Sequence, residues 1–118
     1  MIKTKSIHAT PAQEDGRRYL IDLFWPEGVR THLAHIDEWL KDLGPSYDLQ
    51  RFEFDKNMWA AYAEKYKYEV LHSDGKKELL RKLAQEAKED TITLLYGNKD
   101  PRHNHAVILK NLIETQSV

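Results

Sequence analysis

Residues 98–105 gather the side chains of this sequence that are best suited to acid–base or ion-binding chemistry. They read Asn-Lys-Asp-Pro-Arg-His-Asn-His and follow an apolar run that ends at Tyr96. Histidine titrates near neutral pH, so His103 and His105 are the candidate catalytic proton carriers. The side chains there that could donate hydrogen bonds to an anion are Asn98, Lys99, Arg102 and Asn104. The segment therefore predicts a site for a small anionic molecule.

Two predicted strands would place this segment at the edge of a sheet. Residues 18–25 are almost continuously apolar, which is typical of a strand covered on both faces, and residues 91–96 form a second apolar run. The long crossover between them permits parallel pairing. Because ligands of open α/β sheets bind beyond the carboxyl ends of parallel strands, we expect both strand ends to meet residues 98–105. The ligand-binding side chains that this adds are Asp22, Trp25 and Tyr96, with Glu27 nearby.

Asp100 and Pro101 allow two interpretations. Asp is a preferred helix cap and Pro is favoured at the first helical position, so a helix would begin here, and its free N–H groups would attract an anion. The alternative is an ordinary capped helix with a solvated start. Asn104 and His105 precede apolar residues, so burial is expected for both. His105 is then either a proton carrier or a core histidine bonded to a backbone carbonyl, and both interpretations stay open.

Asp22 interrupts an apolar strand, and a buried carboxylate is costly unless it is paired. If the strand is buried, Asp22 would neutralise Lys99, Arg102 or a histidine of the site. If the strand lies at the edge of the sheet, Asp22 would face solvent instead. The sequence does not decide between these two interpretations.

The remaining motifs predict no further chemistry. The spacing from Tyr96 to Arg102 resembles the oxyanion loop of rhodaneses and phosphatases, but the chain has no cysteine to act as the nucleophile. His32 and His35 stand three residues apart on a predicted helix, with no third metal ligand evident nearby. The sequence therefore predicts no metal site and no cofactor.

Length and composition predict one domain, residues 1–118, that can bury a core without disulfides. The chain has 18 Lys plus Arg against 19 Asp plus Glu, and this balance argues against nucleic acid as a partner. No apolar run is long enough to span a membrane, and the first residues lack the pattern of a signal peptide. Together with the absence of cysteine, this predicts a cytoplasmic protein. Whether it forms a homo-oligomer stays open.

Local signals predict several more elements before residue 55. Residues 2–8 alternate loosely and predict a first strand. Thr10 and Gln13 predict a capping box for a short helical turn. Apolar residues recur on one face of residues 31–43, which predicts a helix capped by Thr31.

Helical patterns dominate most of the rest of the chain. Residues 46–54 fit either a helix or a strand, and a short helix is favoured. Asp55 is predicted to cap a longer helix, residues 73–75 break it, and two more helices follow, one on each side of residues 91–96. The predicted stripe of the longer helix contains Met58, Tyr62, Tyr66 and Val70, with Trp59 and Ala63 beside them. The order of elements predicts a single α/β domain with a small, largely parallel sheet of three or four strands wrapped by helices.

Three blocks, YLIDLFWPEG, IDEWLKDLGPS and TLLYGNKDPRHNHAVILKNL, together resemble the bacterial domain of unknown function 488 family in its short, single-domain form. The match covers nearly the whole chain in the same order. The resemblance implies a small cytoplasmic α/β protein with no assigned reaction. Family members usually read Asp-Arg-Leu-Trp-Pro-Arg-Gly at the second strand and the turn that follows, whereas this chain has Leu23 and Glu27 in place of both arginines. An anion-binding role of those arginines would be lost here or moved to Arg17, Arg30 or Arg102.

The leading hypothesis is an uncharacterised cytoplasmic protein that binds a small anionic ligand at the ends of the strands at 18–25 and 91–96. Modest acid–base chemistry on that ligand is part of this hypothesis, and whether the protein is an enzyme stays open. The alternative is a non-enzymatic interaction module that dimerises or holds a partner through its aromatic helix. Transcription-related DNA binding, a label that some relatives carry, ranks third because no helix-turn-helix pattern or basic face is evident.

Overall fold

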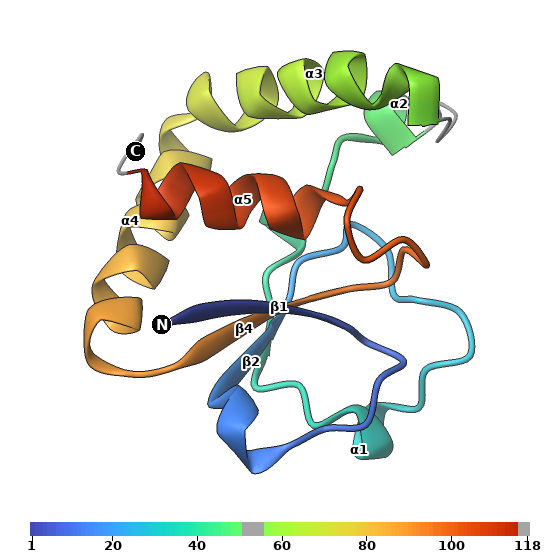
Figure 1. Ribbon diagram of the computed structural model, residues 1–118, viewed down its shortest axis with the longest axis vertical. Helices are drawn as coiled ribbons and strands as arrows, with labels where there is room; N and C mark the ends of the chain where they lie inside the picture. Colours follow the sequence, from blue (N-terminus) through green and yellow to red (C-terminus); the bar gives the residue numbers. More distant parts are fainter. Residues whose placement is uncertain (51–55, 116–118) are drawn as a thin grey trace.

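The computed structural model describes residues 1–50 and 56–115, in which strands alternate with short helices up to the third strand and a run of helices separates the third strand from the fourth (Figure 1). The strands are β1 (Ile2–Ser6), β2 (Arg17–Leu20), β3 (Glu38–Trp39) and β4 (Ile92–Tyr96). The α-helices are α1 (Thr31–Ala34), α2 (Tyr47–Gln50), α3 (Trp59–Leu71), α4 (Asp74–Glu89) and α5 (His105–Glu114). Short 3-10 helices are η1 (Gln13–Asp15), η2 (Lys41–Leu43) and η3 (Lys56–Met58).

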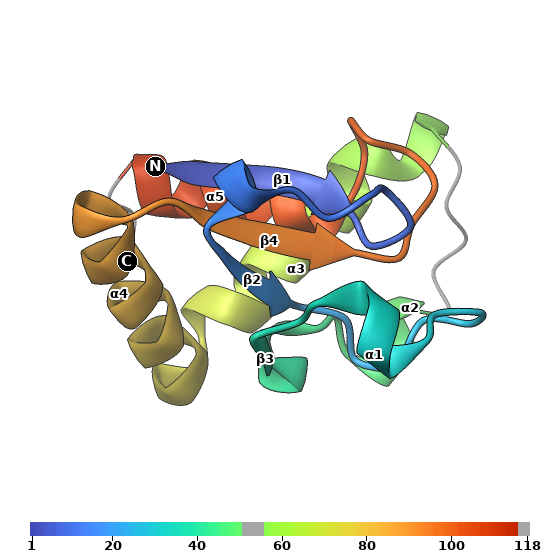
Figure 2. The same ribbon diagram turned by 90° about the horizontal axis from the view of Figure 1, so that it is seen from below.

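The four strands form one parallel sheet in the order β1-β4-β2-β3. β4 is paired on both sides, with Ile92 opposite Ile2 of β1 and Leu94 opposite Tyr19 of β2. The arrowheads of β1, β4 and β2 therefore lie at one edge of the sheet (Figure 2). The predicted small parallel α/β sheet is confirmed, and so is the side-by-side arrangement of the two apolar runs.

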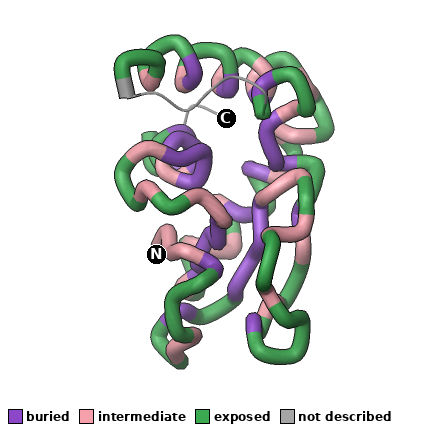
Figure 3. The backbone as a smooth tube through the Cα atoms, turned by 90° about the vertical axis from the view of Figure 1, so that its right-hand side faces the viewer, coloured by how far each residue is buried: buried purple, intermediate pink, exposed green. Residues whose placement is uncertain are grey.

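The sheet is covered on both faces, which explains why β4 is apolar at almost every position. On one face, α3, α4 and α5 pack over Ile92 and Leu94 to form the main core (Figure 1). On the other face, Leu20 and Leu95 pack with Ala34 of α1 in a smaller core. The buried parts of the backbone accordingly gather in the middle of the molecule, with exposed segments outside (Figure 3).

A buried ion pair supports the smaller core. The guanidinium of Arg18 lies 2.5 Å from the carboxylate of Asp15, and Lys5 lies 2.9 Å from the same carboxylate. Arg18 also donates to the backbone carbonyls of Ala34 and His35 at 2.9 and 3.0 Å. This side chain thus holds the end of α1 against β2 with its charge compensated.

The predicted helix at residues 31–43 is wrong beyond its first turn. After α1, His35 adopts a left-handed conformation with φ 50°, and the chain extends into β3 beside β2. Thr31 is the first helical residue rather than the cap, which is Arg30 without a side-chain bond. The helix stops because Arg18 takes the carbonyls at its end, and because the apolar residues that follow divide between the two cores.

The first two strands are shorter than predicted. β1 ends at Ser6, and the predicted capping box is wrong because η1 begins at Gln13 without Thr10 as its cap. β2 ends at Leu20, although the amide of Ile21 still donates to Leu95 at 3.1 Å. The carboxylate of the next residue, Asp22, then accepts from the amide of Gly97, just after β4, and the chain turns away from the sheet.

The helical segments between β3 and β4 largely match the predicted pattern. The part of the predicted short helix at 46–54 that the structure describes is helical as α2, where the hydroxyl of Ser46 accepts from the amide of Leu49 at 3.2 Å, and residues 51–54 lie outside the described residues. The predicted cap Asp55 lies outside the described residues. In α3, Tyr62 and Tyr66 are buried in the main core, whereas Met58 precedes the helix and is exposed. No helix in the described residues is both long and apolar enough to cross a bilayer.

Candidate functional site

A cleft of about 680 Å³ opens where the carboxyl ends of β1, β2 and β4 meet the start of α5. Its walls come from the loops after these strands, from α2 and the residues before it, from α3 and from the first residue of α5. The described residues that line it are His8, Asp22, Phe24, Trp25, Pro26, Glu27, Pro45, Leu49, Gln50, Tyr62, Gly97, Asn98, Lys99 and His105. The cleft lies at the sheet edge where the sequence predicts the site.

Asp22 joins three of these segments at the floor of the cleft. Its Oδ2 atom accepts a hydrogen bond from the amide of Gly97 at 2.8 Å, just after β4. Its Oδ1 atom lies 3.1 Å from Nε2 of His105 on α5, but this buried oxygen accepts no hydrogen bond. The carboxylate is mostly buried, with 16% of the side chain exposed. Asp22 is therefore mostly buried rather than solvent-facing, and of its predicted partners only a histidine, His105, lies within ion-pair distance among the described residues.

His105 is held by the backbone at the end of β2. Its Nε2 atom lies 2.8 Å from the carbonyl oxygen of Ile21. A carbonyl oxygen only accepts hydrogen bonds, so Nε2 carries a proton and donates it to Ile21. The ring also packs edge-on against Tyr66, with centroids 5.7 Å apart. His105 is thus a core histidine bonded to a carbonyl, and it lines the cleft as well.

The loop before α5 is organised by Asp100, which does not cap the helix. Its Oδ1 atom accepts from the amides of Arg102 and His103, and its Oδ2 atom lies 2.9 Å from Nδ1 of His103. These bonds hold the pKa of Asp100 below its usual value. The cap is Asn104, whose side chain accepts from the amide of Val107 at 3.1 Å. The predicted cap at Asp100 is wrong because the loop continues for four residues before the helix begins.

The structure brings some of the predicted site residues together and places others elsewhere. Those that line the cleft are Asp22, Trp25, Asn98, Lys99 and His105. Tyr96 is buried in the main core, and Asn104 is buried in the capping bond. His103 is paired with Asp100 and packs edge-on against Trp59 at 5.1 Å, while Arg102 is exposed and is not among the lining residues.

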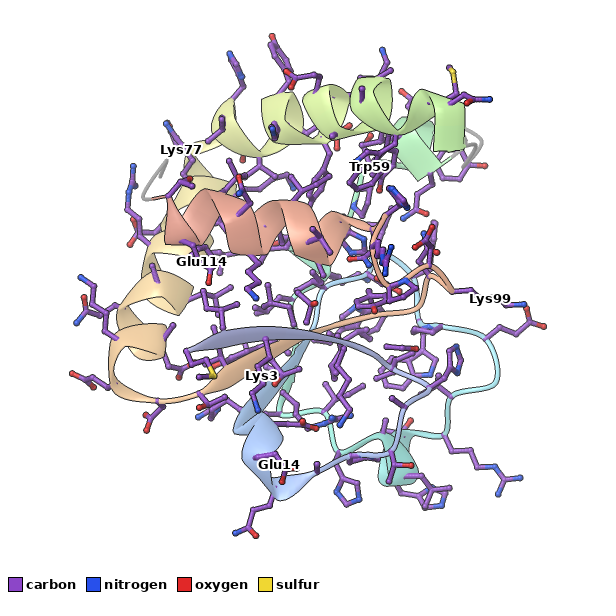
Figure 4. All side chains as sticks on the ribbon, viewed as in Figure 1. Lys3, Glu14, Trp59, Lys77, Lys99 and Glu114 are labelled. Carbon is purple, nitrogen blue, oxygen red and sulfur yellow. The ribbon has the colours of Figure 1, made fainter. Side chains whose placement is uncertain are left out.

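Several lining residues are absent from the prediction. His8 lies at this edge because β1 runs parallel to β4, a direction that the short link between the first two strands does not reveal in the sequence. Leu49, Gln50 and Tyr62 had no signal in the sequence either, because they reach the cleft through the packing of α2 and α3 rather than through a motif. Lys99 extends outward from the loop after β4 at the rim of the site, whereas Trp59 faces the loop before α5 (Figure 4).

The chemistry available in this cleft is hydrogen bonding and charge recognition. Burial raises the pKa of Tyr62, and the carboxylates of Asp22 and Glu69 raise it further, so its hydroxyl stays protonated. Within residues 1–50 and 56–115, no group of three or more His, Asp or Glu side chains is arranged to hold a metal ion. The two carboxylates Asp22 and Glu27 and the ammonium of Lys99 are the charged groups of the lining.

Comparisons with known proteins identify relatives over nearly the whole chain. A family model described as "Inactive DUF488-N3 subclade" matches residues 1–117. The chain is 31% identical over 115 residues to the uncharacterized protein YeaO of Escherichia coli (strain K12), covering 97% of each chain. It is 29% identical over 101 residues to the uncharacterized proteins Rv3073c of Mycobacterium tuberculosis (strain ATCC 25618 / H37Rv) and Mb3100c of Mycobacterium bovis (strain ATCC BAA-935 / AF2122/97), covering 85% of this chain and 82% of each relative. No solved structure matches the chain.

Proposed function

Because the chain belongs to the inactive DUF488-N3 subclade, we propose that it binds a small molecule bearing an anionic group without transforming it. The cleft at the carboxyl ends of β2 and β4 is the binding site. The observation that carries the proposal is the cleft itself, since about 680 Å³ falls within the roughly 300–1,000 Å³ typical of small-molecule sites. Its position, beyond the carboxyl ends of parallel strands, is the one that ligands of α/β sheets use.

The contacts of the two histidines favour binding over catalysis. The Nε2 atom of His105 is engaged by Ile21, and the Nδ1 atom of His103 is engaged by Asp100. Neither histidine therefore offers that nitrogen as a free proton carrier. The family is described as inactive, which agrees with a site that binds a ligand without transforming it.

The anionic group of the ligand belongs at the mouth of the cleft. Lys99 supplies an exposed ammonium there, and the imidazole of His8 and the amides of Asn98 and Gln50 supply further donors. The floor is less suitable for an anion because it carries the carboxylate of Asp22. Arg17, Arg30 and Arg102, to which the sequence would move an anion-binding role of the missing arginines, are not among the lining residues, so in this proposal Lys99 is the cation that binds the anion.

Thermal unfolding in sodium phosphate tests this proposal. At twenty times its dissociation constant, phosphate stabilises the folded state by about 1.8 kcal/mol, a shift of several degrees in Tm for a domain of this size. We expect Lys99→Gln to reduce the shift. Lys88→Gln, which removes an exposed ammonium on α4 away from the cleft, is the matched control and should leave it unchanged. Sodium chloride at equal ionic strength separates specific binding from screening.

Two results would refute anion binding at this cleft. The first is an equal stabilisation by phosphate and by sodium chloride. The second is an equal loss of the phosphate effect in the Lys99 and Lys88 variants, because that would place the ion on the general surface of the protein.

A second candidate function is self-association or partner binding through exposed aromatic residues. Tyr47 and Tyr68 are 62% and 63% exposed, and Phe24 packs edge-on against Tyr47 with centroids 6.4 Å apart. Most of the aromatic helix itself serves the core, so Tyr68 is the member of α3 that this function would use. A molecular mass that rises with concentration in light scattering, and that Tyr68→Ser returns to the monomer value, is the expected result.

Three further expectations from the sequence stay predictions. We propose a cytoplasmic location because the chain of 118 residues contains no cysteine. The balanced charge disfavours nucleic acid as a partner, so we expect no salt-sensitive retention on a DNA duplex. That no membrane is bound also stays a prediction, and a vesicle co-sedimentation assay would test it.

A further inference from the structure

The balance of charge inside the cleft differs from that of a plain anion site. The floor and wall carry two carboxylates, Asp22 and Glu27, against one ammonium, Lys99, at the rim. Glu27 is exposed and forms no ion pair with any residue of the described chain.

No lysine or arginine of the described residues compensates the charge of Asp22. Within residues 1–50 and 56–115 its carboxylate has one ion-pair partner, His105, and no lysine or arginine within 4 Å. The proton on Nε2 of His105 is donated to the carbonyl of Ile21, and Oδ1 of Asp22 is left without a hydrogen bond. The amide of Gly97 is therefore the one hydrogen-bond donor that this carboxylate has. A buried carboxylate in this position favours a cation brought by the ligand.

Aromatic rings stand beside these carboxylates on the same loop. Phe24 is 56% exposed, and Trp25 is partly exposed with its indole N–H donated to Val29 at 2.9 Å. A cation over such a ring is attracted to its face. Tyr62 contributes less, because Trp59 and Tyr66 stack on it with interplanar angles of 20° and 17°. Carboxylates and ring faces are the combination that recognises an amine.

We infer that the ligand carries a cationic amine in addition to its anionic group, with the amine at Asp22, Glu27, Phe24 and Trp25 and the anion at Lys99. The ligand class is therefore a small zwitterion. This inference rests on the proposed function, because it divides the same cleft into an inner subsite for the amine and an outer subsite for the anion.

Titrations followed by ¹H–¹⁵N NMR test the two subsites separately, with ethanolamine and inorganic phosphate as the probes. The amide of Gly97 reports on the inner subsite, because it donates to Asp22. We expect ethanolamine to shift this amide signal in the wild-type protein. Glu27→Gln should weaken ethanolamine binding several-fold and Asp22→Asn at least tenfold. Glu89→Gln, which removes an exposed carboxylate at the end of α4, should leave it unchanged.

The variants and the order of addition separate the possible outcomes. Glu27 is exposed and makes no ion pair, so its variant folds even if that of Asp22 does not. If the amine and the anion occupy different subsites, saturating phosphate should leave the affinity for ethanolamine unchanged or increase it. For the same reason, Lys99→Gln should weaken the binding of phosphate and leave the binding of ethanolamine unchanged. Phosphate binding without ethanolamine binding, or competition between the two probes, would overturn the zwitterion inference and leave the anion site standing. If neither probe binds, the proposed function fails as well.

Discussion

Replacement of Gly97 by alanine tests whether Asp22 is held as the structure describes. A Cβ atom at this position would lie 2.7 Å from Oδ2 of Asp22 and 3.2 Å from Cβ of Pro26. The carboxylate must therefore move and weaken its bond to the Gly97 amide, which is 2.8 Å long. A hydrogen bond to a charged group is worth about 1.5–3 kcal/mol. The smaller conformational freedom of alanine in the unfolded chain offsets about 0.4–1 kcal/mol of this loss.

Gly75→Ala is the matched control, because a Cβ atom there meets nothing within 4 Å. Gly75 lies in the first turn of α4, where alanine is favoured over glycine by about 1 kcal/mol. We expect Gly75→Ala to raise the free energy of unfolding and Gly97→Ala to lower it. The two variants should differ by about 2–3 kcal/mol, which corresponds to about 1 M or more in the urea midpoint.

Urea unfolding followed by circular dichroism measures this difference, and NMR shows whether the Gly97 amide has lost its bond. If Gly97→Ala unfolds at the same urea concentration as the wild type, Asp22 is not packed against Gly97. In that case the floor of the cleft is looser than described, and the amine subsite loses its support.

Three further predictions concern the buried polar groups and a helix cap. Burial raises the pKa of Asp15, whereas hydrogen bonds from the amide of Ala12 and from the side chains of Lys5 and Arg18 lower it. The hydrogen bonds prevail, so the pKa of Asp15 lies below its usual value. Its contribution to stability is therefore complete above the unfolded pKa and is lost as pH falls through the folded one. Asp15→Asn should unfold at less urea at pH 7 and lose less stability than the wild type between pH 5 and pH 2. His105→Ala should lower the free energy of unfolding by about 3 kcal/mol, since it leaves a buried carbonyl without a donor and opens a cavity, and an unchanged Tm would contradict the bond to β2. Ser73→Ala should cost about 1 kcal/mol in the same urea assay, because its hydroxyl accepts from the first turn of α4, and no loss would exclude a capping role.

The sheet could be predicted from sequence because its signals are local and its connection is long. Residues 91–96 were predicted as a strand, and β4 spans Ile92–Tyr96. Such a run of apolar residues fits a strand buried on both faces, and the crossover length allows parallel pairing. The direction of β1 could not be settled in this way, because the link to β2 is short and carries no crossover helix.

The helix predicted at residues 31–43 shows what local periodicity leaves out. Leu33, on the predicted apolar face, is 57% exposed, whereas Ile36 packs in the smaller core and Leu40 in the main core. The guanidinium of Arg18, which ends α1, lies far away in the sequence. The helical spacing of the apolar residues in 31–43 is therefore coincidental, because these residues pack in two different cores.

The site was predicted where polar residues break apolar runs. Asp22 and His105 each stand beside buried apolar neighbours, and they lie 3.1 Å apart in the structure. The cap of α5 was misplaced because Asp100 and Asn104 are equally good capping residues, and only burial of the second distinguishes them. Tyr62 is predicted only as part of the stripe of the longer helix, since its place in the lining of the cleft depends on how α3 crosses the end of the sheet.

The position of β4 also constrains how the protein folds. The strand that arrives last along the chain lies between β1 and β2, which have no direct pairing with each other. During synthesis on the ribosome, β1 and β2 remain unpaired with β4 until residues 92–96 have emerged. Contacts between segments so distant in sequence slow folding, and exposed strand edges in the interval favour aggregation. The strand whose end borders the cleft is thus also the one that joins the two halves of the sheet.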